Sequence, residues 1–274
     1  MCHIRRNRAF AILALVASFL CASPARADEI ITLETRPGVT QSMQLWTPHE
    51  IKPKAIALLI PGGPGNIGLR HKEGRVEVER PHLFSTWRDA LLQGQFAVAV
   101  LDASSDQGDM TQEFRTSTAH MHDMQAVIGE LQRRFPHARL IMVAHSRGTI
   151  TAGYIARLLD GQISAAVLLS GLYQATLPGP NAPSSGPGLS QIDLLSLKTP
   201  FLLVHHVNDS CPVAPVSAAE KLGARIPLIS IGGSTELEDV FPCGPGSNHW
   251  FSGHESDVTQ QVVHWLTEKS DYPN

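Results

Sequence analysis

The chain has 274 residues, of which 43% are hydrophobic and 17% are charged. This length supports one large domain with a sizeable core, and the apolar content excludes an intrinsically disordered chain. The formal net charge of −3 gives no basic footprint for nucleic acid, and four cysteines are too few for a disulfide-built miniprotein.

Residues 1–27 have the pattern of a secretory signal peptide. An arginine-rich start is followed by an apolar run over 9–22, and Ala25 and Ala27 supply the small residues of a cleavage site. The run is shorter than the roughly 20 residues that span a bilayer, so we expect cleavage; a retained membrane anchor is the alternative. The sequence therefore predicts a periplasmic or secreted domain of residues 28–274, with no stable membrane anchor after cleavage.

Removal of this segment changes the charge and the cysteine count. The segment carries four arginines and no acidic residue, so the net charge of the mature chain becomes −7. Cys211 and Cys243 are the cysteines that remain. An even pair in an exported protein is a disulfide candidate, with two free buried thiols as the alternative.

Short apolar runs alternate with helical segments along the mature chain. Ile30–Leu33 and Met43–Trp46 are predicted to form a hairpin at a sheet edge. Apolar runs predict buried strands at Ala55–Ile60, Phe96–Leu101, Leu140–Val143, Ala165–Leu169, Phe201–Val204 and Leu228–Ile231. Helices are predicted at Trp87–Leu92, Ser117–Phe135, Ile150–Leu159, Val216–Leu222 and Val258–Leu266.

This alternation predicts an α/β fold: a mainly parallel sheet with helices on both faces. The chain shows no internal repeat and no second domain. The segment 174–190 is rich in proline, glycine, serine and asparagine, and it is too short and polar for a folded cap. We therefore expect a small lid or none.

A nucleophile candidate follows the strand Leu140–Val143. The string Ala-His-Ser-Arg-Gly at 144–148 resembles the nucleophile elbow Gly-x-Ser-x-Gly of the α/β-hydrolase family, with Ala144 in place of the first glycine. Small residues are needed on both sides of the serine because the turn is strained and tightly packed. The resemblance implies that Ser146 is the nucleophile and that the backbone N–H of Arg147 contributes to an oxyanion hole. An ordinary turn with a surface serine is the alternative.

The other members of a catalytic triad occur in the chain order of this family, serine, acid, histidine. Asp209 follows the strand Phe201–Val204, and His249 lies in the loop before the last helix. The resemblance therefore implies that Asp209 is the acid and His249 the base. Poorer candidates by position are Asp193, Asp257, His254 and His264.

Two further histidines, His205 and His206, neighbour the acid and are candidates for lining the pocket. An alternative metal site would combine them with His249 and His254. Their spacing fits no zinc pattern, so we expect neither a metal nor a cofactor.

The segment after the first central strand is a candidate for the second part of the oxyanion hole. Pro-Gly-Gly-Pro-Gly-Asn at 61–66 occupies the place of the family's His-Gly-x segment and resembles the His-Gly-Gly-Pro-Gly of proline iminopeptidase-like members. The resemblance implies that Gly63, together with Gly65 or Asn66, donates a backbone N–H, whereas Pro64 has none to donate. A plain turn is the alternative.

Together these signals predict a serine hydrolase that cleaves a carboxylic ester of a small-molecule acyl substrate. A disulfide between Cys211 and Cys243 would join the acid loop to the histidine loop. The alternatives are an exported peptidase of the proline iminopeptidase type and a non-catalytic binding protein with an α/β-hydrolase fold. No signal indicates an oligomeric state or a nucleic-acid partner. Four basic residues are expected at the solvated surface, with a place at the pocket rim, where they would attract anions, as the alternative: Arg70, His71, Arg88 and Arg115.

Overall fold

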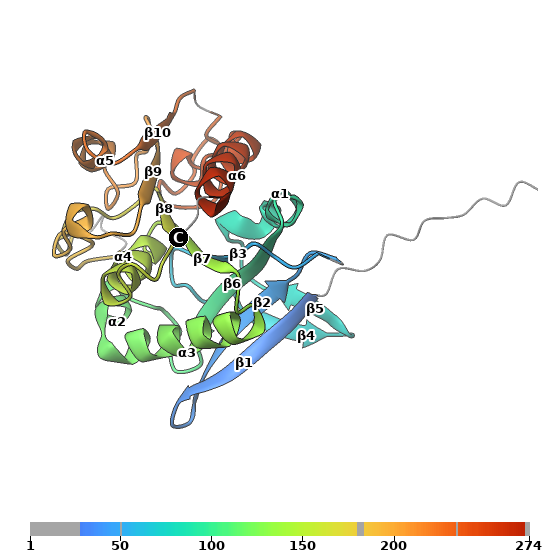
Figure 1. Cartoon of the computed structure of the whole chain (residues 1–274). Helices are drawn as coiled ribbons and strands as arrows, with labels where there is room; N and C mark the ends of the chain where they lie inside the picture. Colours follow the sequence, from blue (N-terminus) through green and yellow to red (C-terminus); the bar gives the residue numbers. More distant parts are fainter. Residues whose placement is uncertain (1–27, 50, 180–183, 234, 272–274) are drawn as a thin grey trace, which may run out of the picture.

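The computed structural model describes residues 28–49, 51–179, 184–233 and 235–271, so the predicted signal peptide lies outside the described chain. An eight-stranded sheet of order β1-β2-β6-β3-β7-β8-β9-β10 runs through the molecule (Figure 1). Its strands are β1 (Asp28–Arg36), β2 (Val39–Trp46), β3 (Ala55–Ile60), β6 (Phe96–Ser104), β7 (Arg139–His145), β8 (Ala165–Leu169), β9 (Phe201–His206) and β10 (Leu228–Ile231).

The sheet is antiparallel only at its leading edge. β1 and β2 form a hairpin, β2 lies antiparallel to β6, and the remaining pairs of this sheet are parallel. This confirms the predicted mainly parallel sheet with an edge hairpin. The carboxyl ends of parallel strands meet at one edge of a sheet, where α/β proteins place their binding sites.

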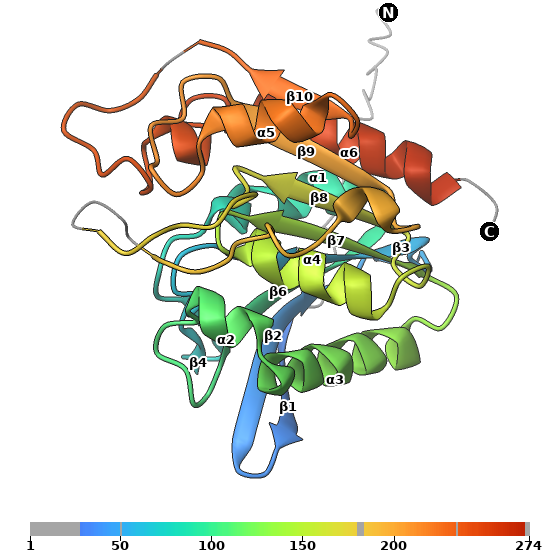
Figure 2. The same cartoon turned by 90° about the vertical axis from the view of Figure 1, so that its left-hand side faces the viewer.

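Helices cover both faces of the sheet (Figure 2). Side chains of α1 (Arg88–Gln93) and α6 (Glu255–Asp271) share one apolar core with Ala57 and Leu59 of β3. The helices of the opposite core are α3 (Thr118–Arg134), α4 (Gly148–Leu158) and α5 (Val216–Gly223). Alternate residues of β3, such as Leu58 and Ile60, belong to that second core. The central strands are therefore continuously apolar because both of their faces are buried.

Some short helices and strands were not predicted from the sequence. β4 (Leu69–Lys72) and β5 (Arg75–Val78) form a charged hairpin with little burial, and the alternation of Val76 and Val78 in β5 is too short to mark a strand in the sequence. The helix α2 (Gln112–Thr116) has only five residues. Single turns of 3-10 helix lie at Leu83–Thr86, Leu194–Ser196 and Asn248–Trp250.

The region over the carboxyl edge of the sheet carries no helical cap in its described part. Between β8 and the 3-10 turn at Leu194–Ser196, residues 170–179 and 184–193 contain no helix. Within the described ranges, no helix combines the length and the apolar character needed to cross a bilayer.

Candidate active site

Ser146 occupies a sharp turn between β7 and α4. Its φ of 51° lies in the left-handed region, which residues other than glycine rarely adopt. The Ser146 N–H donates to the carbonyl oxygen of Leu169 at 2.9 Å, and the Ser146 carbonyl accepts from the Thr149 N–H at 2.9 Å. A Cβ at Gly148 would collide with the carbonyl oxygen of Ile60. The turn is thus held by backbone bonds and admits only glycine two residues after the serine.

The structure brings Ser146, His249 and Asp209 into one hydrogen-bonded chain. His249 Nε2 lies 2.9 Å from Ser146 Oγ, and His249 Nδ1 lies 2.8 Å from Asp209 Oδ2. The side chains of Asp209 and His249 are fully buried. The serine comes from the turn after β7, the acid from the loop after β9, and the histidine from the 3-10 turn before α6. A carboxylate that orients a histidine beside a serine hydroxyl is the arrangement that activates a nucleophile.

The carboxylate of Asp209 has more partners than the sequence predicted. Its Oδ1 accepts the backbone N–H of Cys211 at 2.9 Å, and its Oδ2 also lies 3.1 Å from Nε2 of His205. Burial raises the pKa of the Asp209 carboxyl, but the His249 charge and the hydrogen bonds from His205 and His249 outweigh burial and hold this pKa below its ordinary range. Asp209 is therefore a carboxylate at neutral pH.

Two side chains that the sequence did not assign hold the backbone of His249. Its carbonyl oxygen accepts hydrogen bonds from Nε2 of His145 at 3.1 Å and from Oγ of Ser170 at 2.9 Å. Because a carbonyl oxygen can only accept, His145 carries a proton on Nε2. Burial lowers the pKa of His145 to about 3, so its imidazole is neutral. The ring of His145 also packs edge-on against Trp250, with the ring centroids 5.4 Å apart.

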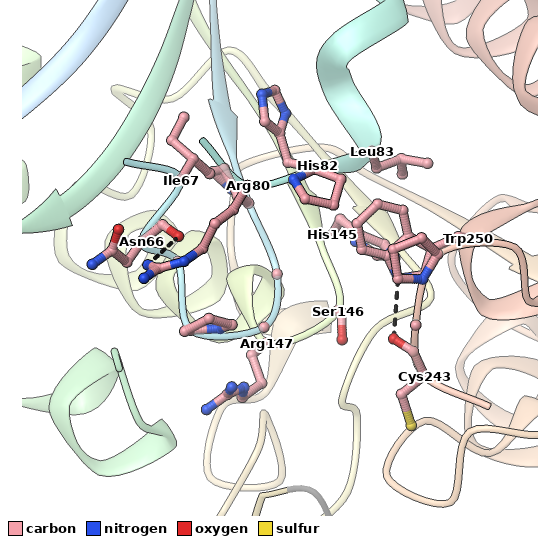
Figure 3. Close-up of a pocket in the computed structure, with 18 of the residues that line it drawn as sticks. Asn66, Ile67, Arg80, His82, Leu83, His145, Ser146, Arg147, Cys243 and Trp250 are labelled. Carbon is pink, nitrogen blue, oxygen red and sulfur yellow. Dashed lines mark hydrogen bonds between the residues drawn. The ribbon is translucent and has the colours of Figure 1, made fainter. Parts of the chain in front are cut away.

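A disulfide joins Cys211 and Cys243, whose Cα atoms lie 4.8 Å apart. Cys211 stands two residues after Asp209, and the carbonyl oxygen of Cys243 accepts a hydrogen bond from Nε1 of Trp250 at 3.0 Å (Figure 3). The acid loop and the histidine loop are therefore connected by a covalent bond.

Ser146 opens into a cavity of about 360 Å³ (Figure 3). One part of its lining is the loop 61–67. Apolar side chains that line it include Val213, Phe241 and Trp250. His205 and His206 are buried outside this lining, contrary to the expectation that they face the pocket. The cavity thus offers a partly apolar chamber beside the serine hydroxyl.

The loop 61–67 lies against Ser146. A Cβ at Gly62 would come within 2.8 Å of the Ser146 Cβ, so only glycine permits this approach. The Gly65 N–H donates to the Gly62 carbonyl oxygen at 3.0 Å. This bond corrects the expectation that Gly65 donates to the oxyanion hole, because its N–H already closes a turn. The N–H groups of Gly63 and Arg147 find no acceptor among the described residues.

The turn also fixes the direction of the Gly63 N–H, the remaining candidate donor of this loop. The C=O and N–H of a trans peptide group point in opposite directions, and no described peptide bond is cis. Since the Gly62 carbonyl faces Gly65, the N–H of Gly63 in the same peptide group points away from Gly65. Gly63 lines the cavity, as does Asn66, whose carbonyl oxygen accepts from Arg80 at 3.2 Å.

Two charged residues anchor the loop from behind. The Asp102 carboxylate, at the end of β6, accepts the backbone N–H groups of Ile67 at 2.7 Å and Leu69 at 2.8 Å. Arg115 of α2 donates to the carbonyl oxygen of Pro61 at 3.2 Å. Arg115 was predicted at the surface but is fully buried, because this contact and its neighbours lie inside the protein.

The four histidines of the alternative metal site do not converge on one point. His205 and His249 both contact Asp209, whereas His206 packs near His254 with ring centroids 5.8 Å apart. Within the described ranges, no group of three or more His, Cys, Asp or Glu side chains is placed to hold a metal ion.

The chain is similar to solved structures that include a serine hydrolase homologue, esterases and a peptidase. No protein-family model and no curated protein sequence matches the chain. The chain is similar to an alpha-beta serine hydrolase homologue from Coxiella burnetii, with 14% identity and a TM-score of 0.59 over 87% of this chain and 97% of that one. It is similar to Est1E from Butyrivibrio proteoclasticus, with 16% identity and a TM-score of 0.62 over 88% and 98% of the two chains.

A third similar structure is the acylaminoacyl peptidase of Pyrococcus horikoshii, with 14% identity and a TM-score of 0.60. That match covers 91% of this chain but only 42% of the peptidase. The strand order, the helices on both faces and these similarities agree, and the chain has the α/β-hydrolase fold.

Proposed function

We propose that the protein is a serine hydrolase that cleaves carboxylic esters through an acyl-enzyme on Ser146. The observation that carries this proposal is the continuous hydrogen-bonded chain from Asp209 through His249 to Ser146, ending at an open cavity. A binding protein has no need of this chain, and the strained turn at Ser146 exposes a hydroxyl where a substrate carbonyl can reach it.

The chemistry follows from the roles that these positions allow. Ser146 Oγ attacks the acyl carbonyl carbon while His249 Nε2 takes the hydroxyl proton. Asp209 holds His249 in the required tautomer and stabilises its protonated form. The protonated His249 then gives its proton to the departing alcohol, and water releases the acid from Ser146 by the same steps in reverse. The N–H groups of Gly63 and Arg147 stabilise the negative oxygen of each tetrahedral intermediate.

Several features favour an ester over a peptide as the substrate. An ester needs less help for its leaving group than an amide does. Est1E, a similar structure, has also been solved with ferulic acid, a carboxylic acid, bound. The described part of 170–193 has no helix, whereas the iminopeptidase-type enzymes that the loop 61–66 resembles carry a helical cap.

Hydrolysis of p-nitrophenyl acetate, p-nitrophenyl butyrate and an aminoacyl p-nitroanilide tests this proposal. We expect turnover of the esters and none of the anilide, and we expect Ser146→Ala to abolish the ester activity. Turnover of the anilide alone would favour the peptidase. No turnover of any substrate by folded protein would favour a non-catalytic binding protein.

We also propose that the protein is exported after removal of residues 1–27. The disulfide supports an oxidising compartment. N-terminal sequencing of the protein recovered from an expressing bacterial host is expected to start at Asp28, and an intact Met1 would contradict export by cleavage.

A further inference from the structure

A buried arginine lies directly behind the loop that faces Ser146. The Arg115 guanidinium donates from Nη2 to the carbonyl oxygens of Pro61 at 3.2 Å and Gly63 at 3.4 Å. It also donates from Nη1 to Thr151 Oγ1 at 3.1 Å and from Nε to the Met110 carbonyl oxygen at 3.1 Å. Each of these acceptors is a neutral oxygen.

The positive charge of Arg115 has no carboxylate partner in the described part of the chain. Asp109 acts on it only from a distance, since its carboxylate pairs with Arg147 at 2.9 Å. Burial lowers the pKa of the Arg115 guanidinium to about 9, and Arg147 adds to this effect, so Arg115 stays charged at neutral pH. A buried cation without a counter-ion destabilises a fold, so stability alone does not explain this residue.

The contacts of Arg115 bracket the candidate oxyanion donor. The Pro61 carbonyl precedes the Gly62–Gly63 peptide group, and the Gly63 carbonyl follows it. A guanidinium bonded to both therefore restrains the peptide group between them. A Cβ at Gly65 would lie 2.7 Å from Nη2, so the glycine at this position gives the guanidinium its access to the loop.

We propose that Arg115 is a positioning residue of the oxyanion hole, and that its buried charge stabilises the negative oxygen formed when Ser146 attacks. In that step the Ser146 Oγ bonds to the carbonyl carbon, the hydroxyl proton passes to His249, and the carbonyl π electrons move to the oxygen. One negative charge thus appears beside the Gly63 N–H, with the Arg115 cation behind the loop. This inference rests on the proposed hydrolase function.

Three substitutions separate the charge of Arg115 from its hydrogen bonds. Arg115→Lys keeps the charge, Arg115→Gln keeps donors without a charge, and Arg115→Met keeps neither. We expect kcat for p-nitrophenyl acetate to fall in the order Lys, Gln, Met, by about tenfold to a hundredfold for Gln, with KM within about twofold of wild type.

A second measurement distinguishes positioning from general destabilisation. An aryl trifluoromethyl ketone adds to Ser146 and forms an oxyanion, whereas the matching methyl ketone mimics the neutral ground state. We expect affinity for the fluorinated ketone to fall in parallel with kcat, and binding of the methyl ketone to stay unchanged. His120→Gln is the matched control, because His120 contacts Thr151 at the far end of the same network at 2.9 Å. It is expected to lower stability without changing kcat.

A folded Arg115→Gln or Arg115→Met variant with wild-type kcat would overturn the inference, as would a loss of kcat without loss of ketone affinity. If neither variant folds, Arg115→Lys decides: we expect parallel losses of about threefold to tenfold in kcat and ketone affinity, and wild-type values would overturn the inference. Failure of the wild type to hydrolyse the ester would instead defeat the proposed function.

Discussion

The two sides of the candidate active site are held in different ways. On one side, the loops that carry Asp209 and His249 are joined by a disulfide and by hydrogen bonds to buried side chains. On the other side, the loop 61–67 is held through its own backbone groups by Asp102 and Arg115. In the proposed mechanism, the first side fixes the angle of an imidazole ring and the second presents a backbone N–H. His205 shares the Asp209 Oδ2 atom with His249, and the other restraints act through groups that the proposed chemistry leaves unused.

Substitution of Asp209 should reduce catalysis more than any other change proposed below. Asp209→Asn should lower kcat about 10⁴-fold with little change in KM, because an amide favours the wrong tautomer of His249. Asp193→Asn is the control, since Asp193 caps the 3-10 turn at Leu194–Ser196. Ester hydrolysis by the two purified variants checks both. A severe loss in Asp193→Asn with normal activity in Asp209→Asn would reverse the assignment of the acid.

The next effect tests the anchoring of the loop 61–67. Asp102→Asn should lower kcat by about tenfold to a hundredfold, because the loop loses charge-assisted bonds at Ile67 and Leu69 and the Gly63 N–H is less well fixed. Asp106→Asn, which removes a partly exposed pair with Arg36, should leave kcat unchanged. Steady-state kinetics of the two variants measure this difference. Equal kcat values for Asp102→Asn and Asp106→Asn would show that Asp102 does not act on the loop.

A smaller effect on catalysis is expected from the covalent link. The double variant Cys211→Ser and Cys243→Ser should lose about 3–4 kcal/mol of unfolding free energy, the value expected for closing a loop of this length, and only a few-fold in kcat. Urea unfolding and ester kinetics measure the two quantities. Unchanged stability in this variant would show that the disulfide does not stabilise the fold. Two free thiols in the non-reduced mature wild type would show that it does not form.

The last prediction concerns a residue whose substitution should leave kcat unchanged and alter acid stability instead. Burial lowers the pKa of His120 to about 3 from an ordinary 6.5. Between these two pH values the unfolded chain therefore binds a proton at His120 that the folded chain does not bind. Stability present above pH 6.5 is therefore lost as the pH falls toward 3, by about 1.4 kcal/mol per pH unit for one proton. Urea unfolding of His120→Gln between pH 6.5 and 4 should show a shallower slope than the wild type. Identical slopes would show that His120 takes up its proton in the folded state.

The residues of the site that could be predicted were those whose side chains are assigned a direct chemical role. Ser146, Asp209 and His249 follow apolar strands or precede the last helix, so their positions along the chain could be compared with a known order. The fold was predictable for the same reason, because buried parallel strands are continuously apolar. The hairpin β4–β5 escaped because its residues are charged and partly exposed.

The supporting residues could not be predicted because their roles depend on partners distant in sequence. Arg115 acts on a loop about 50 residues earlier, and Ser170 bonds the His249 carbonyl 79 residues later. The correction at Gly65 has a similar cause, since a glycine-rich string does not show which N–H groups close turns among themselves. An arginine in a polar segment resembles a surface residue until the surrounding chain is seen to bury it.

Labelling of the folded wild type by a fluorophosphonate probe tests whether Ser146 is an activated nucleophile. Such probes phosphonylate a serine that an adjacent base activates, and mass spectrometry of the digested protein identifies the residue. We predict a single labelled site at Ser146, lost in Ser146→Ala and strongly slowed in Asp209→Asn. An unlabelled wild type, or equal labelling of Ser146→Ala, would contradict the assignment of Ser146 as the activated nucleophile.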